Sequence, residues 1–150
     1  MSKNLYDSCY VHTCLIPAVC KTTADATGTG VAVGSYESAL MIWQQGISGD
    51  TLSGSTYWTI TFEESAALAS GYSTIADADF VSGKGTVTID AAAEDPTQLV
   101  REYKGSKAYV RMIGTQTGTH TNGTPLAAII VLNRPRKQPV TQVTELGTAS

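Results

Sequence analysis

The sequence predicts an all-β domain, a β-sandwich or a barrel, and its composition supports this prediction in two ways. Charged residues make up 15% of the 150 residues, below the share of about 25% that is usual. The chain also contains 14 Gly, 13 Ser and 21 Thr. Few charges, many hydroxyl groups and frequent glycines are typical of short strands joined by turns. A chain of 15.8 kDa is long enough for one domain with its own core.

The first half of the chain contains two predicted strands. Residues 36–45 (YESALMIWQQ) are apolar on both faces, which predicts a central strand, although ten residues could also form a short helix. In residues 57–64 (YWTITFEE), three large apolar residues alternate with polar ones, so this strand should have one face in water. Before them, residues 9–16 can form a strand that Pro17 ends, followed by a flexible link at 22–30.

Four more strands are predicted in the second half. Residues 86–90 (TVTID) form a short strand. Residues 99–103 and 108–113 are predicted to form a hairpin around the turn 104–107 (KGSK). Residues 126–132 (LAAIIVL) are apolar on both faces, which favours a buried central strand.

These elements divide the chain into three parts. An N-terminal arm with a first strand covers residues 1–30, the β-sandwich covers 31–133, and an extended C-terminal tail covers 134–150. Neither arm has a core of its own, so we expect a neighbouring subunit to hold both arms.

Charge and hydropathy exclude several classes of partner. The net charge of −3 supplies no basic field for nucleic acid. The apolar run 126–132 is far shorter than the roughly 20 residues of a membrane helix, so no membrane contact is expected. No secretory signal is expected, and three cysteines close together near one end indicate reduced thiols in a chain made in a cytoplasm.

No catalytic residue, cofactor or metal site is predicted, so we expect no enzyme activity. The two histidines, His12 and His120, accompany no nucleophile motif. Strand alternation separates Cys9 from His12 and Cys14, which disfavours zinc and favours small side chains packed in a strand. Among the carboxylates, Glu63 and Glu64 should point to opposite faces, and Asp77 with Asp79 could bind a cation but more readily cap a turn.

Basic side chains stand out in two places, the predicted hairpin and the segment after the last strand. They could contact an acidic protein surface, touch nucleic acid, or be ordinary solvated charges, and the net charge disfavours nucleic acid. As hypothetical protein contacts they are Arg101, Lys104, Lys107, Arg111, Arg134, Arg136 and Lys137.

Six pieces of sequence, in order, resemble a family of small capsid proteins of tailed bacteriophages and gene transfer agents. These proteins act as decoration, cement or head-spike-base proteins. The chain departs from the family pattern at Asn133-Arg134, where the family has Gly-His, and at Ala108, which replaces an Arg. The similar segments are 15–19 (LIPAV), 34–39 (GSYESA), 49–50 with 61–65 (GD and TFEES), 77–79 (DAD), 103–111 (YKGSKAYVR) and 132–136 (LNRPR).

The resemblance implies an all-β, jelly-roll-like antiparallel sandwich with extended N- and C-terminal arms. It implies a virion protein on the capsid exterior, synthesised in the bacterial host cytoplasm. The implied partners are the major capsid protein and copies of itself on a symmetry axis, with a head fibre or spike protein as a further candidate. Two alternatives stay open: a head–tail connector or tail component, and a jelly-roll module that binds a carbohydrate or receptor.

Overall fold

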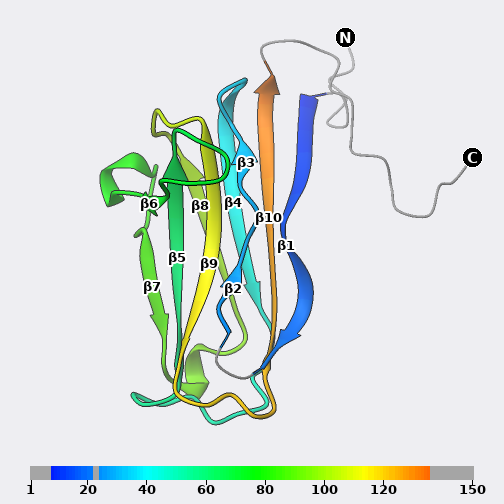
Figure 1. The fold of residues 1–150 in the computed structure, drawn as a ribbon, viewed down its shortest axis with the longest axis vertical. Coiled ribbons are helices and arrows are strands. Elements are labelled where there is room, and N and C mark those ends of the chain that lie inside the picture. Colours follow the sequence, from blue (N-terminus) through cyan, green and yellow to red (C-terminus); the bar gives the residue numbers. More distant parts are fainter. Residues whose placement is uncertain (1–7, 22–23, 136–150) are drawn as a thin grey trace, which may run out of the picture.

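The computed structural model describes residues 8–21 and 24–135, which form an antiparallel β-sandwich of two sheets (Figure 1). This confirms the predicted fold class. Two short 3-10 helices, Asp77–Asp79 and Ala92–Glu94, lie in the connections. The strands are β1 (Cys9–Cys20), β2 (Ala26–Thr27), β3 (Val31–Ala32), β4 (Tyr36–Gln45), β5 (Tyr57–Ser65), β6 (Ser73–Thr74), β7 (Thr86–Ile89), β8 (Thr97–Tyr103), β9 (Tyr109–Thr117) and β10 (Thr124–Pro135).

The first sheet has the strand order β1–β10–β4–β8. The second has the order β2–β9–β5–β6, with β3 also paired to β9 and β7 also paired to β5. The two central strands of each sheet therefore come from distant parts of the chain. The strands run along the long axis of the molecule, so the connecting loops gather at its two ends (Figure 1).

The core lies between the sheets and follows from alternation along the central strands. Trp43 of β4 and Trp58 of β5 are fully buried, one from each sheet. Gly114 of β9 leaves room for both, since a Cβ there would lie 2.7 Å from Trp43 and 3.4 Å from Trp58. The indole N–H of Trp58 donates to Thr124 Oγ1 at 3.0 Å, which joins the core to the start of β10.

The strand predictions for 36–45, 57–64, 86–90 and 126–132 are confirmed, with small shifts at their ends. The predicted inward residues of β5, Trp58, Ile60 and Phe62, are all fully buried. Both β4 and β10 lie inside the first sheet, as their apolar sequences predicted.

The predicted hairpin of residues 99–113 is wrong. Strand β8 pairs with β4 in the first sheet, whereas β9 pairs with β5 in the second. Residues 104–107 therefore cross from one sheet to the other. A four-residue connection between two strands fits a hairpin and a crossing equally well, and only the pairing with distant strands decides between them.

The predicted end of the first strand at Pro17 is also wrong, because β1 continues to Cys20. The register with β10 shifts between Leu15 and Ala18, so Pro17 lies in an irregular part of the ladder. β1 is an edge strand, where a residue without an N–H is tolerated.

Most of the described residues of the two predicted arms are in strands of the sandwich. Residues 9–20 pair with β10, and β2, which lies within the link predicted to be flexible, pairs with β9. Arg134 and Pro135 are the last residues of β10. Residues 136–150 lie outside the described residues. The part of the chain that the structure describes has no helix long and apolar enough to span a bilayer.

Gly114 provides a test of this core. Gly114→Ala places a methyl group against Trp43, and we expect it to lower the free energy of unfolding by about 1–3 kcal/mol through overpacking. Gly54→Ala is the matched control, because a Cβ at Gly54 meets nothing within 4 Å. Urea denaturation followed by tryptophan fluorescence measures both. Equal stability of the two variants would contradict the packing described.

Candidate interaction site at one end of the sandwich

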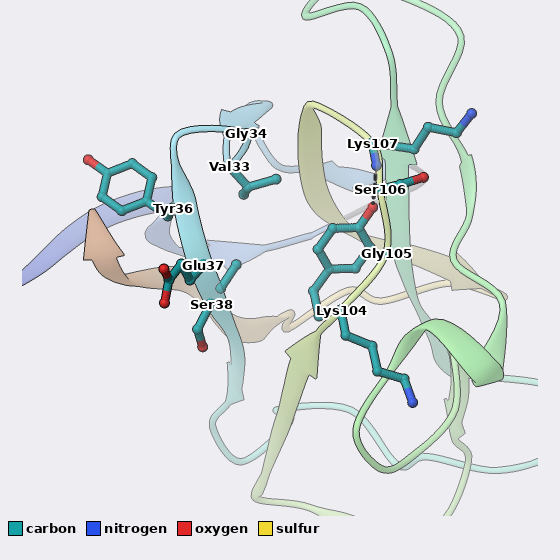
Figure 2. Close-up of a pocket in the computed structure, with 11 residues that line it drawn as sticks. Val33, Gly34, Tyr36, Glu37, Ser38, Lys104, Gly105, Ser106 and Lys107 are labelled. Carbon is teal, nitrogen blue, oxygen red and sulfur yellow. Dashed lines mark hydrogen bonds between the residues drawn. The ribbon is translucent and has the colours of Figure 1, made fainter. Parts of the chain in front are cut away.

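A pocket of about 390 Å³ opens at the end of the sandwich where β4 begins and β8 ends (Figure 2). One wall is the turn before β4 and its first residues, from Val33 to Ala39. The other wall is Tyr103 and the crossing loop 104–107. The pocket therefore lies between a strand of the first sheet and the loop that leaves that sheet.

Tyr103 holds the crossing loop in place. Its hydroxyl donates to Glu64 Oε2 at 2.5 Å and accepts the backbone N–H of Lys107 at 2.9 Å. Burial and the hydrogen bond to the Glu64 carboxylate raise the pKa of Tyr103 above its ordinary value. Gly105 passes close over the tyrosine ring, where a Cβ would approach ring atoms to 2.5 Å. The loop is thus fixed by a tyrosine bound to the second sheet.

Lys104 and Lys107 flank the pocket and carry its positive charge. Both are exposed, and their side chains extend away from the pocket into solvent (Figure 2). The backbone N–H of Lys104 donates to Asp79 O at 2.9 Å. The loop backbone is therefore anchored at both lysines, while the ammonium groups stay accessible to a partner.

Arg134 lies at the same end, beside the first residues of β4. Its guanidinium is 3.9 Å from Glu37 Oε2, and both side chains are largely exposed, so this ion pair contributes little to stability. Ser38, next to Glu37, donates its hydroxyl to Glu102 Oε1 at 2.8 Å. This end of the sandwich presents charges of both signs.

The other two described basic residues of the predicted contact set are engaged within the chain. Arg111 Nε donates to Glu63 Oε2 at 2.7 Å, and its guanidinium lies 4.0 Å from the centre of the Tyr72 ring. Arg101 donates to two backbone carbonyl groups and lies over the ring of Phe62. The structure therefore leaves Lys104, Lys107 and Arg134 exposed at the same end of the sandwich. Arg136 and Lys137 lie outside the described residues.

Two of the six segments that carry the family resemblance form the walls of this pocket, and parts of three others lie next to them, whereas residues 15–19 and 49–50 lie towards the other end of the sandwich. Residues 34–39 and 103–107 form its walls. Residues 132–135 pair with the start of β4, and 61–65 bring Glu64 to Tyr103. Residues 77–79 accept the Lys104 N–H. Segments that are far apart in the sequence are neighbours here.

The histidine, cysteine and carboxylate candidates have ordinary structural contacts. Within residues 8–21 and 24–135, no group of three His, Cys, Asp or Glu side chains is placed to hold a metal ion. Burial raises the pKa of the Cys14 thiol to about 11, which keeps it protonated and unreactive. Asp77 accepts the Gly85 N–H at 2.8 Å, the turn contact that was preferred for it. Glu63 and Glu64 reach different partners, as their adjacent positions predicted.

One surface was missed by the sequence reasoning: the outer face of the first sheet. We call it the aliphatic face and define it by Val11, Leu40, Ile42, Val100, Ile129 and Val131. The signal was present, because residues 36–45 and 126–132 are apolar on both faces. Apolarity on both faces predicts burial on both faces, whereas Val11 and Val100 are exposed and the other four residues are only partly buried.

Comparison of the chain with models of protein families, with curated proteins and with solved structures gives no significant match.

Removing the Tyr103 hydroxyl tests how the pocket is held. Tyr103→Phe leaves Glu64 and the Lys107 N–H without their shared partner, and we expect a loss of about 1–2 kcal/mol of stability. Because the tyrosine pKa is raised on folding, its contribution is complete below the ordinary pKa near 10 and declines at more alkaline pH.

Denaturant unfolding at pH 7 and at pH 11 measures both effects, with Tyr57→Phe as the control. The difference between Tyr103→Phe and the original chain should shrink at pH 11. A difference that is absent at pH 7 would contradict the role assigned to this hydroxyl.

Proposed function

We propose that this chain is a virion structural protein that decorates or stabilises the capsid of a tailed phage, in a cement or spike-base role, by binding the major capsid protein. The observation that carries the proposal is that two resemblance segments, 34–39 and 103–107, form the two walls of one pocket, with residues 61–65, 77–79 and 132–135 in contact with those walls.

The charges at this end support a protein partner. Lys104 and Lys107 are exposed on a backbone that hydrogen bonds hold in place, so a partner would order little beyond the two side chains. Arg134 adds a third positive charge nearby, and Arg136 and Lys137 follow it directly in the sequence. An acidic patch on a capsid subunit is the complementary surface.

The strand order supports the jelly-roll part of the proposal. We count β2 with β3 as one strand and β6 with β7 as another. The chain then has eight strands, in the order 1-8-3-6 in one sheet and 2-7-4-5 in the other. A double sheet of eight strands is the jelly-roll arrangement, which is common among capsid and lectin domains.

Charge reversal tests the site against preformed heads that lack this protein. The variants Lys104→Glu with Lys107→Glu, and Arg134→Glu with Arg136→Glu, should each bind at least about 10-fold more weakly, since they replace attraction by repulsion. Lys21→Glu is the matched control. Lys21 is exposed and directly follows Cys20, which pairs with Thr124 at the opposite end of the sandwich, so this variant should bind as the original chain does.

Co-sedimentation with heads at two salt concentrations measures the effect. The loss of binding should be larger at low salt, where exposed charges are screened less. Unchanged occupancy by both charge-reversed variants would overturn the assignment of this end as the capsid contact.

A carbohydrate-binding role is the second candidate, and one groove favours it. The groove, of about 470 Å³, is lined by the aromatic side chains of Tyr10, His12, Tyr36 and Tyr109. Trp43 and Trp58 cannot stack against a sugar ring, because both are fully buried. A glycan array separates the two roles. Binding to a glycan that Tyr36→Ala abolishes would favour this candidate, and an empty array would remove it.

A further inference from the structure

The two sheets of the sandwich have very different outer faces. On the second sheet, most neighbours of the outward residues of the central strand β5 are hydroxyl or charged side chains, with Ile113 opposite Thr61 as an exception. Thr59 lies between Thr88 and Thr115, and Glu63 lies opposite Arg111. This is the usual pattern of an antiparallel sheet with one face in water.

The outer face of the first sheet lacks that pattern. Its inner positions are identified by burial, since Ala39, Met41 and Trp43 are in the core, so the residues between them point outward. The register then places the aliphatic face in two neighbouring rows across four strands. One row is Val11–Val131–Leu40, continued by Glu102, and the other is Thr13–Ile129–Ile42–Val100.

The aliphatic face has an apolar centre and an uncharged border. The neighbouring rows are Cys9–Asn133–Ser38 on one side and Ala127–Gln44–Gln98 on the other. Within these four rows Glu102 is the one charged residue, and its carboxylate accepts a hydrogen bond from Ser38. Val11 and Val100, at the two edges, are 49% and 40% exposed. Depletion of charge around an apolar centre is the composition of a protein interface.

We propose that a second copy of this chain covers the aliphatic face, so that two sandwiches stack through their β1–β10–β4–β8 sheets. The near absence of charge on the aliphatic face favours a second copy of the chain as the partner. A strongly charged partner would find one carboxylate to pair with, whereas another aliphatic face brings an equally uncharged surface. The same patch on both copies closes the contact by two-fold symmetry.

The size of the face corresponds to a small interface. The two rows of the aliphatic face and the two rows that border it, about 7 Å apart along four strands spaced about 4.8 Å, outline a patch of about 15 Å by 25 Å. The resulting area of about 400 Å² is about half of the roughly 800 Å² that each partner contributes to a standard interface, so we expect a weak dimer that forms at micromolar concentrations. The inference assigns a surface to the self-association within the proposed function. It is tested on the purified chain alone, so its outcome is independent of capsid binding.

Sedimentation velocity of the purified full-length chain provides the test. The original chain should sediment as a dimer of twice 15.8 kDa at micromolar concentrations. Ile42→Lys places an unpaired charge at the centre of the contact and should weaken the dimer about 100-fold or more. Thr61→Lys, on the outer face of central strand β5 of the other sheet, is the matched control and should remain dimeric.

A milder variant keeps the test valid if the lysine disturbs folding. Ile42→Thr with Ile129→Thr retains β-branched side chains, which suit strands, and removes apolar surface that only a partner would cover. It should keep the circular dichroism spectrum of the original chain and weaken the dimer about 10-fold or more.

Three results would overturn the proposal. They are a monomer of 15.8 kDa for the original chain throughout the micromolar range, a dimer that withstands both aliphatic-face variants, and a dimer that Thr61→Lys disrupts equally.

Discussion

The packing of two tryptophans against one glycine is the constraint on which the rest of the structure depends. Trp43 and Trp58 come from different sheets and share the space that Gly114 leaves open. Packed sheets are about 10 Å apart, so two indole rings fill this layer only where the facing strand has no side chain. The hydrogen bond from Trp58 to Thr124 adds β10 to the arrangement. These contacts set the positions of β4, β5, β9 and β10, the central strands of both sheets.

Strand β4 contributes both to this core and to the two surfaces described above. Its inward residues are core, its outward residues Leu40 and Ile42 belong to the aliphatic face, and its first residues form a wall of the end pocket. The pocket and the aliphatic face are therefore two surfaces of one strand held by the same core. The low charge of the chain is most evident on the outer face of the first sheet, whose four central rows contain one charged residue, Glu102, whereas Glu63 and Arg111 lie opposite each other on the second sheet.

The alternation of polar and apolar residues along the chain predicted most of the strands. It could not predict which strands pair with each other when they are far apart in the sequence. Strands β4 and β5 were predicted from period-two patterns that their own residues carry. The crossing at 104–107 was mistaken for a hairpin because its outcome depends on the distant Glu64, which binds Tyr103. For the same reason, charge alone could not show that Arg111 contacts Glu63 and Tyr72 within the chain. Apolarity on both faces showed that β4 is central and could not show whether a second layer covers its outer side.

The central claim is that this sandwich is a repeated building block on the outside of a capsid. Cryo-electron microscopy of purified particles, together with quantification of this chain per particle, tests the claim most directly. The account predicts two-sheet density on the outer surface of the head, in a copy number that is a multiple of 60 or runs to hundreds. A ring of six or twelve copies at the tail vertex, or absence of the chain from purified particles, would contradict it.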